Sequence, residues 1–201
     1  MVRQPEEVIL PMPSPVVVAR HARSTILMGS ISCIRELGRF DEYVTHLPDA
    51  HRELLLDAVA AAWIPMDVAF SHYSACDALN FPVDQQVQNG RVTFDKNRGT
   101  LLGTVVRMAT QSGMTPWSVF PHFQRFWERG YDGGGVRVVK LGPKEVRLEL
   151  VAVHVTDSRY YRNALRGLVM AVTELFCRKA YATEIPGQRG TGTVGYRVQW
   201  A

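Results

Sequence analysis

Residues 136–151, VRVVKLGPKEVRLELV, carry the strongest β-strand signal in the chain. Two runs rich in Val and Leu flank Gly142-Pro143-Lys144, a break of the length that joins the strands of a hairpin. Apolar and charged residues alternate in the second run, so one face of the sheet is expected to be buried and the other to contact water. We therefore predict strands over Val136–Leu141 and Val146–Val155.

A helix and two more strands follow this hairpin. Ser158 or Asp157 is a suitable N-cap, and an apolar stripe with helical spacing continues to Phe176. The runs Lys179–Ile185 and Thr193–Trp200 have strand character, and the second alternates cleanly between large apolar and polar residues. The C-terminal half, residues 134–200, is therefore predicted to have ββαββ order.

The period of the apolar residues is helical upstream of Gly135. Pro121 is expected to bend the last helix there, and the polar stretch Asp84–Gly90 is expected to lie between helices. The predicted helices cover Ile26–Leu37, Asp49 to just before Pro65, Asp67–Leu79, Arg98–Gln111 and Thr115–Trp127.

The chain begins with a proline-rich segment, residues 1–25, which is expected to be extended or partly disordered because proline donates no backbone hydrogen bond. Val16–Ala19 is a candidate edge strand within it. Residues 26–201 are predicted to form a single domain of the α+β class, helical over 26–131, with the N-terminal helices packed on the C-terminal antiparallel sheet.

Composition narrows the class of protein. The chain has 201 residues and 46% hydrophobic content, which suits one substantial core. No apolar run approaches the roughly 18–20 residues that a membrane span requires. The three cysteines are widely spaced, as expected for reduced thiols in the cytoplasm. The net charge of +4 is spread along the chain, so nucleic acid is an unlikely partner.

Small and aromatic residues scattered from about Leu27 to Trp200 form a recognisable pattern. They are Met28-Gly29-Ser30, Gly38-Arg39-Phe40, Leu47-Pro48, Ala62-Trp63, Gly113, Phe126-Trp127 and Val198-Gln199-Trp200. This pattern resembles a large paralogous family of uncharacterised proteins from myxobacteria and their relatives. More remotely, the two hairpins around one helix resemble the fold shared by the 4-vinyl reductase domain, haem-type nitric-oxide sensors and TRAPP transport-complex subunits. That resemblance implies an apolar cavity between helices and sheet. In the proteins that share this fold, the cavity takes up haem, tetrapyrrole precursors or acyl groups.

Haem is the most specific ligand that the resemblance implies. Haem-type sensors use a proximal histidine and a Tyr-x-Ser-x-Arg motif just before the helix of the C-terminal half, and chain order makes His122 the corresponding ligand candidate. The matching segment, Asp157–Arg162, reads DSRYYR, which has the residue types but not the spacing. We therefore predict no cofactor.

Other chemical signatures are weak. His72 and Cys76 stand four residues apart on a predicted helix, but two ligands do not make a metal site. The loop Pro186–Gly192 lacks the Gly-Lys-Ser/Thr ending of a phosphate-binding loop, and no Gly-x-Ser-x-Gly motif is present. We predict no metal site and no catalytic residue.

The leading hypothesis is a non-catalytic ligand-binding or sensory domain that holds a small apolar or planar molecule between helices and sheet. One alternative is a protein-interaction module of the TRAPP type that forms a homodimer. The other is an enzyme that acts on a small molecule in the same cavity. The residues expected to contact the ligand are aromatic or lie in the first turn of the C-terminal helix. They are Trp117, Phe120, His122, Phe123, Trp127, Tyr160, Tyr161 and Arg162.

Overall fold

The computed structural model describes residues 6–97, 99, 103 and 113–201. The helix predicted over Arg98–Gln111 falls almost entirely outside these described residues. Within the described part, no helix is long and apolar enough to cross a membrane.

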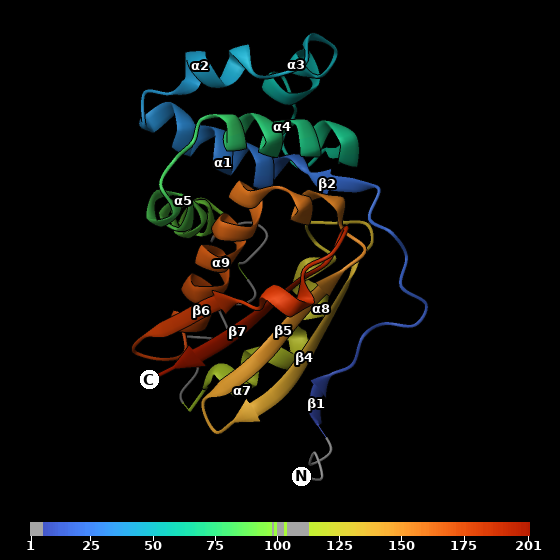
Figure 1. Cartoon of the computed structure of the whole chain (residues 1–201), viewed down its shortest axis with the longest axis vertical. Coiled ribbons are helices and arrows are strands. Elements are labelled where there is room, and N and C mark those ends of the chain that lie inside the picture. The colour runs from blue at the N-terminus through green and yellow to red at the C-terminus, as the bar shows by residue number, and fades with distance from the viewer. Residues whose placement is uncertain (1–5, 98, 100–102, 104–112) are drawn as a thin grey trace.

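A five-stranded antiparallel sheet forms one end of the molecule (Figure 1). Its strand order is β1-β4-β5-β7-β6, so the two C-terminal hairpins lie side by side and the N-terminal strand adds an edge. The strands are β1 (Glu7–Leu10), β4 (Gly135–Gly142), β5 (Glu145–Val151), β6 (Ala180–Glu184) and β7 (Val194–Trp200). The α+β class predicted from the sequence is confirmed.

The two faces of the sheet differ as the alternation predicts. Val138 faces Leu148 across the β4–β5 pair, and Leu148 faces Tyr196 across the β5–β7 pair; all three side chains are buried. On the opposite face Arg147 bonds to Glu149 at 2.7 Å and to Glu6 at 2.7 Å. The buried face therefore carries the core, and the other face carries a network of ion pairs.

Most helices gather at the other end of the molecule, whereas α7 (Pro116–Val119) and α8 (Phe123–Trp127) lie by the sheet and α9 (Arg159–Glu174) extends from the helical end to the sheet (Figure 1). A small two-stranded sheet, β2 (His21–Arg23) with β3 (Trp63–Pro65), lies beside them. Phe120–His122 form a 3-10 turn between the last two short helices, where Pro121 was expected to cause a bend. The helices are α1 (Ser24–Glu36), α2 (Phe40–Thr45), α3 (Asp49–Leu56), α4 (Met66–Ala78), α5 (Val83–Lys96), α7 (Pro116–Val119), α8 (Phe123–Trp127) and α9 (Arg159–Glu174).

The start of α9 is fixed by side-chain acceptors. Ser158 is the N-cap, and its Oγ accepts a hydrogen bond from the Tyr161 N–H at 3.1 Å, as the sequence predicted. The Asp77 carboxylate on α4 accepts the N–H groups of Arg159 and Tyr160 at 3.2 and 2.6 Å. A negative charge at a helix N-terminus is favourable, so α4 and α9 are held together at this point.

Helices α5 and α9 approach each other very closely. A Cβ atom added at Gly90 would lie 1.8 Å from the Ala164 carbonyl oxygen, and one at Gly167 would lie 1.9 Å from the Val87 oxygen. The backbone that Gly167 approaches therefore belongs to α5 and not to the sheet. Only glycine permits this crossing, because any side chain would overlap the opposite backbone.

The structure corrects two predictions near the N-terminus. Val16–Ala19 forms no strand, whereas Glu7–Leu10 pairs with β4, since the ladder of β4 supplies its hydrogen bonds. The helix from Asp49 ends at Leu56 instead of continuing towards Pro65. Ala61 then has φ 60°, and the chain turns into β3.

Two further predictions were wrong in the middle of the chain. Asp84–Gly90 lies within α5, because two of its polar residues, Gln86 and Asn89, are buried with partners: the Gln86 side chain donates to the Phe81 carbonyl at 2.7 Å. The strand predicted over Val146–Val155 ends at Val151, since Ala152 has φ 61° and a 3-10 turn follows.

Candidate functional site

A cavity of about 130 Å³ lies between the helices and the buried face of the sheet. Val136 on β4 and Leu148 and Leu150 on β5 form its floor. Leu165 and Leu168 on α9 form one wall. These side chains point inward because they occupy the buried face of the sheet and the apolar stripe of α9.

Aromatic side chains of α8 form a second wall. Phe123, Phe126 and Trp127 all line the cavity. The Trp127 indole stacks on Tyr131 with ring centroids 4.2 Å apart and an angle of 16°. Its Nε1–H donates to the Gly133 carbonyl at 2.8 Å. Because the polar atom of Trp127 is bonded away from the cavity, the ring offers an apolar surface to a ligand.

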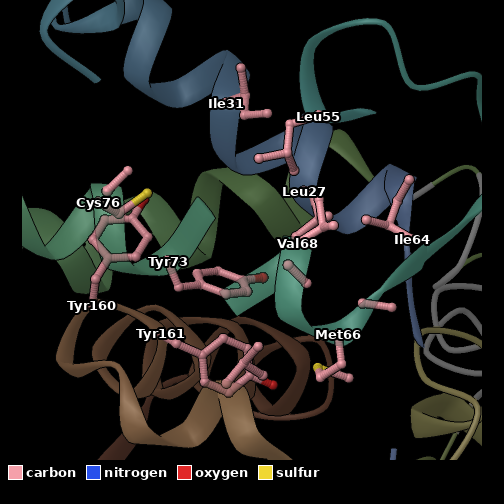
Figure 2. Packing of buried hydrophobic residues seen from close by; sticks show 14 of the residues in the cluster. Leu27, Ile31, Leu55, Ile64, Met66, Val68, Tyr73, Cys76, Tyr160 and Tyr161 are labelled. Carbon is pink, nitrogen blue, oxygen red and sulfur yellow. The ribbon is translucent and has the colours of Figure 1, made fainter. Parts of the chain in front are cut away.

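Three tyrosines from distant parts of the chain meet at the cavity. Tyr73 on α4 and Tyr161 on α9 are in edge-to-face contact at 4.8 Å, and Figure 2 shows their hydroxyls on the same side. The hydroxyls of Tyr131 and Tyr161 are 3.0 Å apart and hydrogen bonded.

These tyrosine hydroxyls are neutral at physiological pH. Burial raises the pKa of Tyr131 to about 12, because a phenolate in this interior would lose its hydration. Burial also raises the pKa of Tyr73 and of Tyr161 well above the ordinary value. Each hydroxyl is therefore available both as a hydrogen-bond donor and as an acceptor.

The remaining polar side chains in the lining have partners. Ser30 Oγ is 3.2 Å from the Tyr160 hydroxyl, and the Asn97 side chain donates to the Thr93 carbonyl at 2.9 Å. Thr93 Oγ1 contacts the Cys33 sulfur at 3.8 Å. Among the described lining residues none is Asp, Glu, Lys, Arg or His, so this part of the cavity surface is uncharged.

The structure brings three of the predicted contact residues to the cavity: Phe123, Trp127 and Tyr161. Trp117 and Phe120 lie in the neighbouring core, where both rings contact Trp200 at 5.0 and 5.6 Å. The Trp117 Nε1–H donates to the Pro143 carbonyl at 2.9 Å. Helical spacing could not separate these positions, because the 3-10 turn at Phe120–His122 rotates α7 relative to α8.

The other predicted residues have different surroundings. His122 is half-buried, with its ring 6.4 Å from that of Phe126. The Tyr160 hydroxyl accepts from the Asn89 side chain at 3.2 Å, within the helical end of the molecule. Arg162 is buried and bonds to Glu184 at 3.2 Å and to the Thr156 carbonyl at 2.9 Å, so its charge is already paired.

His72 and Cys76 share a face of α4, and among the described residues no third metal-ligating side chain joins them. His72 Nδ1 is 2.8 Å from the Tyr43 hydroxyl, and Cys76 Sγ is 3.7 Å from His72 Nε2. Burial lowers the pKa of His72 to about 3, so the ring is neutral. Across the described residues, no three His, Cys, Asp or Glu side chains are grouped as metal ligands.

Sequence reasoning missed Tyr73, Tyr131 and the sheet residues Leu148 and Leu150 as lining residues. The two leucines carried a usable signal, since they lie on the face of β5 that the alternation marks as buried. The tyrosines carried none, because their meeting depends on the packing of α4 against α9 and on the turn that precedes β4.

Solved structures of H-NOX proteins share this fold. The Fe(II) unliganded H-NOX protein from K. algicida aligns with 89% of this chain and 96% of its own, with a TM-score of 0.64 and 9% identity. An oxygen-binding H-NOX domain related to soluble guanylate cyclases aligns with 89% of this chain and 94% of its own, with a TM-score of 0.57 and 12% identity. A mutant of the T. tengcongensis H-NOX aligns with 89% of this chain and 97% of its own, with a TM-score of 0.55 and 13% identity.

At these identities the likeness shows the fold alone. It confirms, at that level, the remote similarity to haem-type nitric-oxide sensors that the sequence indicated. No protein-family model and no curated protein matches the sequence.

Proposed function

We propose that this protein is a non-catalytic, sensory ligand-binding domain that holds a small apolar molecule in the cavity between α8, α9 and the sheet. The observation that carries this proposal is the cavity itself, about 130 Å³ in volume and lined mainly by aliphatic and aromatic side chains. Ligand sites are typically apolar hollows with a few placed polar groups, and the three tyrosine hydroxyls match that description.

Haem is the obvious ligand to consider, since the H-NOX relatives of this fold include proteins studied for heme distortion. Protein ligands to haem iron are chiefly histidine, cysteine or tyrosine. Neither His nor Cys occurs among the described lining residues, and residues 98–112 contain no His, Cys or Tyr in their sequence.

Charge and size also disagree with haem. Its propionates need cationic partners, but the described lining has none, and Arg162 is committed to Glu184 and to backbone carbonyls. An apolar protein cavity of about 150 Å³ holds a benzene molecule. A cavity of about 130 Å³ therefore suits a molecule with a single ring, and the described lining residues do not fit a tetrapyrrole.

Several expectations from the sequence accompany this proposal. They are membership of the myxobacterial family, a cytoplasmic location and a homodimer as the alternative arrangement. Light scattering on the purified protein tests the last of these, since a strict monomer would remove the interaction-module hypothesis.

A titration with toluene tests the proposed function. Toluene is apolar and close to benzene in size, so it is expected to enter the cavity and shift the methyl NMR signals of Leu148, Leu150, Leu165 and Leu168. Substituting Val136→Phe or Leu165→Trp places a ring in the cavity and should abolish those shifts. The matched control is Val8→Phe on β1, where the native side chain is 41% exposed and lies away from the cavity.

Two results would contradict the proposal. One is an absence of shifts in the lining methyl groups of the native protein near the solubility limit of toluene. The other is unchanged toluene binding in both filled variants while circular dichroism shows that they are folded.

A further inference from the structure

The tyrosine cluster of the cavity has an unused hydrogen-bond donor. Tyr73, Tyr131 and Tyr161 carry three hydroxyls, and each hydroxyl has one O–H donor. The hydroxyls of Tyr131 and Tyr161 are bonded to each other at 3.0 Å, and this bond uses one of the three donors. In the part of the chain that the structure describes, these hydroxyls have no other hydrogen-bond acceptor, which leaves at least the Tyr73 O–H without a partner.

This unused donor is buried and faces a space large enough for a ligand. Tyr73, Tyr131 and Tyr161 are only 3%, 4% and 4% exposed, and all three line the cavity. Leaving a buried donor unpaired is unfavourable, so an occupant with an acceptor atom is preferred over one without. The edge-to-face packing of Tyr73 on Tyr161 and the stacking of Tyr131 on Trp127 hold the hydroxyls in place.

The rest of the cavity limits what else the ligand can carry. Leu148, Leu150 and Leu165 offer apolar contact, and Trp127 offers a ring face whose N–H is bonded elsewhere. No described lining residue is cationic, so a carboxylate or phosphate would lose its hydration without gaining an ion pair. An ionised ligand is therefore disfavoured.

We infer that the ligand is a neutral molecule with one aromatic ring and one oxygen acceptor, of the class of phenols and aryl aldehydes or ketones, and that a hydroxyl of the Tyr73–Tyr131–Tyr161 cluster donates to that oxygen. This inference rests on the proposed function, because it concerns the occupant of the same cavity. The ring lies among the leucines of the sheet and α9, and the oxygen lies at the tyrosines.

Phenol and toluene form a matched pair of probes. They have nearly the same shape, but toluene has a methyl group where phenol has its hydroxyl. The dissociation constant of each is measured by methyl NMR, and the ratio of the toluene value to the phenol value is compared between variants. Phenol and toluene differ in hydration, but this difference belongs to the free probes and is the same for every variant. Comparing the ratios between variants therefore cancels it.

The test variant replaces all three tyrosines, Tyr73→Phe/Tyr131→Phe/Tyr161→Phe. Removing the whole cluster leaves no hydroxyl unpaired, so the fold is expected to tolerate the change. The control is Tyr196→Phe, which removes a buried hydroxyl that donates to the Arg162 carbonyl, away from the cavity. In the triple variant the ratio should fall about 2- to 10-fold, the value of one hydrogen bond, and in the control it should not change.

Each outcome has a distinct meaning. If toluene binds the native protein and the ratio is the same in the native and triple variants, the tyrosine cluster does not select the ligand and this inference is overturned. If neither probe binds the native protein, the proposed function itself fails. Benzoate, the ionised third probe, should bind more weakly than phenol, and tighter binding of benzoate would also overturn the inference.

Discussion

Substituting Gly90→Ala should destabilise the protein through a single contact between α5 and α9. The added Cβ atom would lie 1.8 Å from the Ala164 carbonyl oxygen, whereas carbon and carbonyl oxygen normally approach no closer than about 3.3 Å. The helices must therefore separate by about 1.5 Å at this crossing. The obstructing atom belongs to the backbone of α9, so no rotation of a side chain relieves the overlap.

The magnitude follows from two opposing effects. Overpacking of this kind costs about 1–3 kcal/mol or more, because the backbone and its neighbours must shift. Alanine regains about 1 kcal/mol over glycine from its higher helix propensity. Since the overlap is with backbone, we expect a cost near the upper end of this range and a net loss of about 2 kcal/mol in the free energy of unfolding.

Gly29→Ala on α1 is the matched comparison. Its Cβ would lie 2.9 Å from the end of the Asn97 side chain and 3.1 Å from a methyl group of Thr93, both of which can move. The helix-propensity gain is the same as for Gly90, so a change within about 1 kcal/mol is expected.

Urea unfolding followed by circular dichroism measures both values. The double variant Gly90→Ala/Gly167→Ala should lose less than the sum of the single variants, since one separation of α5 from α9 relieves both overlaps. Equal stabilities for Gly90→Ala and Gly29→Ala would refute the reasoning.

Two further predictions concern buried polar groups. Burial lowers the pKa of His72 to about 3, whereas the unfolded chain binds this proton near pH 6.5, so its contribution is complete above pH 6.5 and is lost as the pH falls. The free energy of unfolding should fall by about 1.4 kcal/mol per pH unit between pH 6.5 and 3 because of this group. The His72→Gln variant lacks it, so between pH 7 and 4.5 its free energy of unfolding in urea titrations should fall by about 2–3 kcal/mol less than that of the native protein. Arg91 bonds to both oxygens of Glu174 at 2.5 and 3.2 Å, and only 21% and 20% of the two side chains are exposed. Arg91→Ala should therefore lower the free energy of unfolding by about 1–2 kcal/mol. The Arg197 side chain is 56% exposed in its pair with Glu145, so Arg197→Ala should lower it by less than about 0.5 kcal/mol. Similar losses for the two arginine variants would show that burial does not govern the strength of these pairs.

The C-terminal half of the fold was predictable because its patterns are local. The alternation in β5 and β7, the break at Gly142-Pro143-Lys144 and the Ser158 cap each depend on a few neighbouring residues. The helix α5 was not predictable in the same way. Its polar residues Gln86 and Asn89 are buried against partners from other elements, so its periodicity does not separate an apolar face from a solvated one.

The cavity was only partly predictable. The aromatic residues of α8 and the first turn of α9 were reasonable candidates, and Phe123, Trp127 and Tyr161 do line the cavity. Tyr160 and Tyr161 are adjacent in sequence but have different partners, because the helical turn directs one towards Asn89 and the other towards Tyr131. Such a distinction depends on three-dimensional packing, and spacing along the chain does not contain it.

The most direct test of a ligand-sized apolar cavity is a crystal of the protein under xenon pressure. Xenon enters dry apolar cavities of this size, and its anomalous scattering locates it without reference to the protein atoms. The account predicts a xenon peak among Trp127, Leu148 and Leu165. An interior with no xenon peak, in which these three side chains pack against one another, would contradict it.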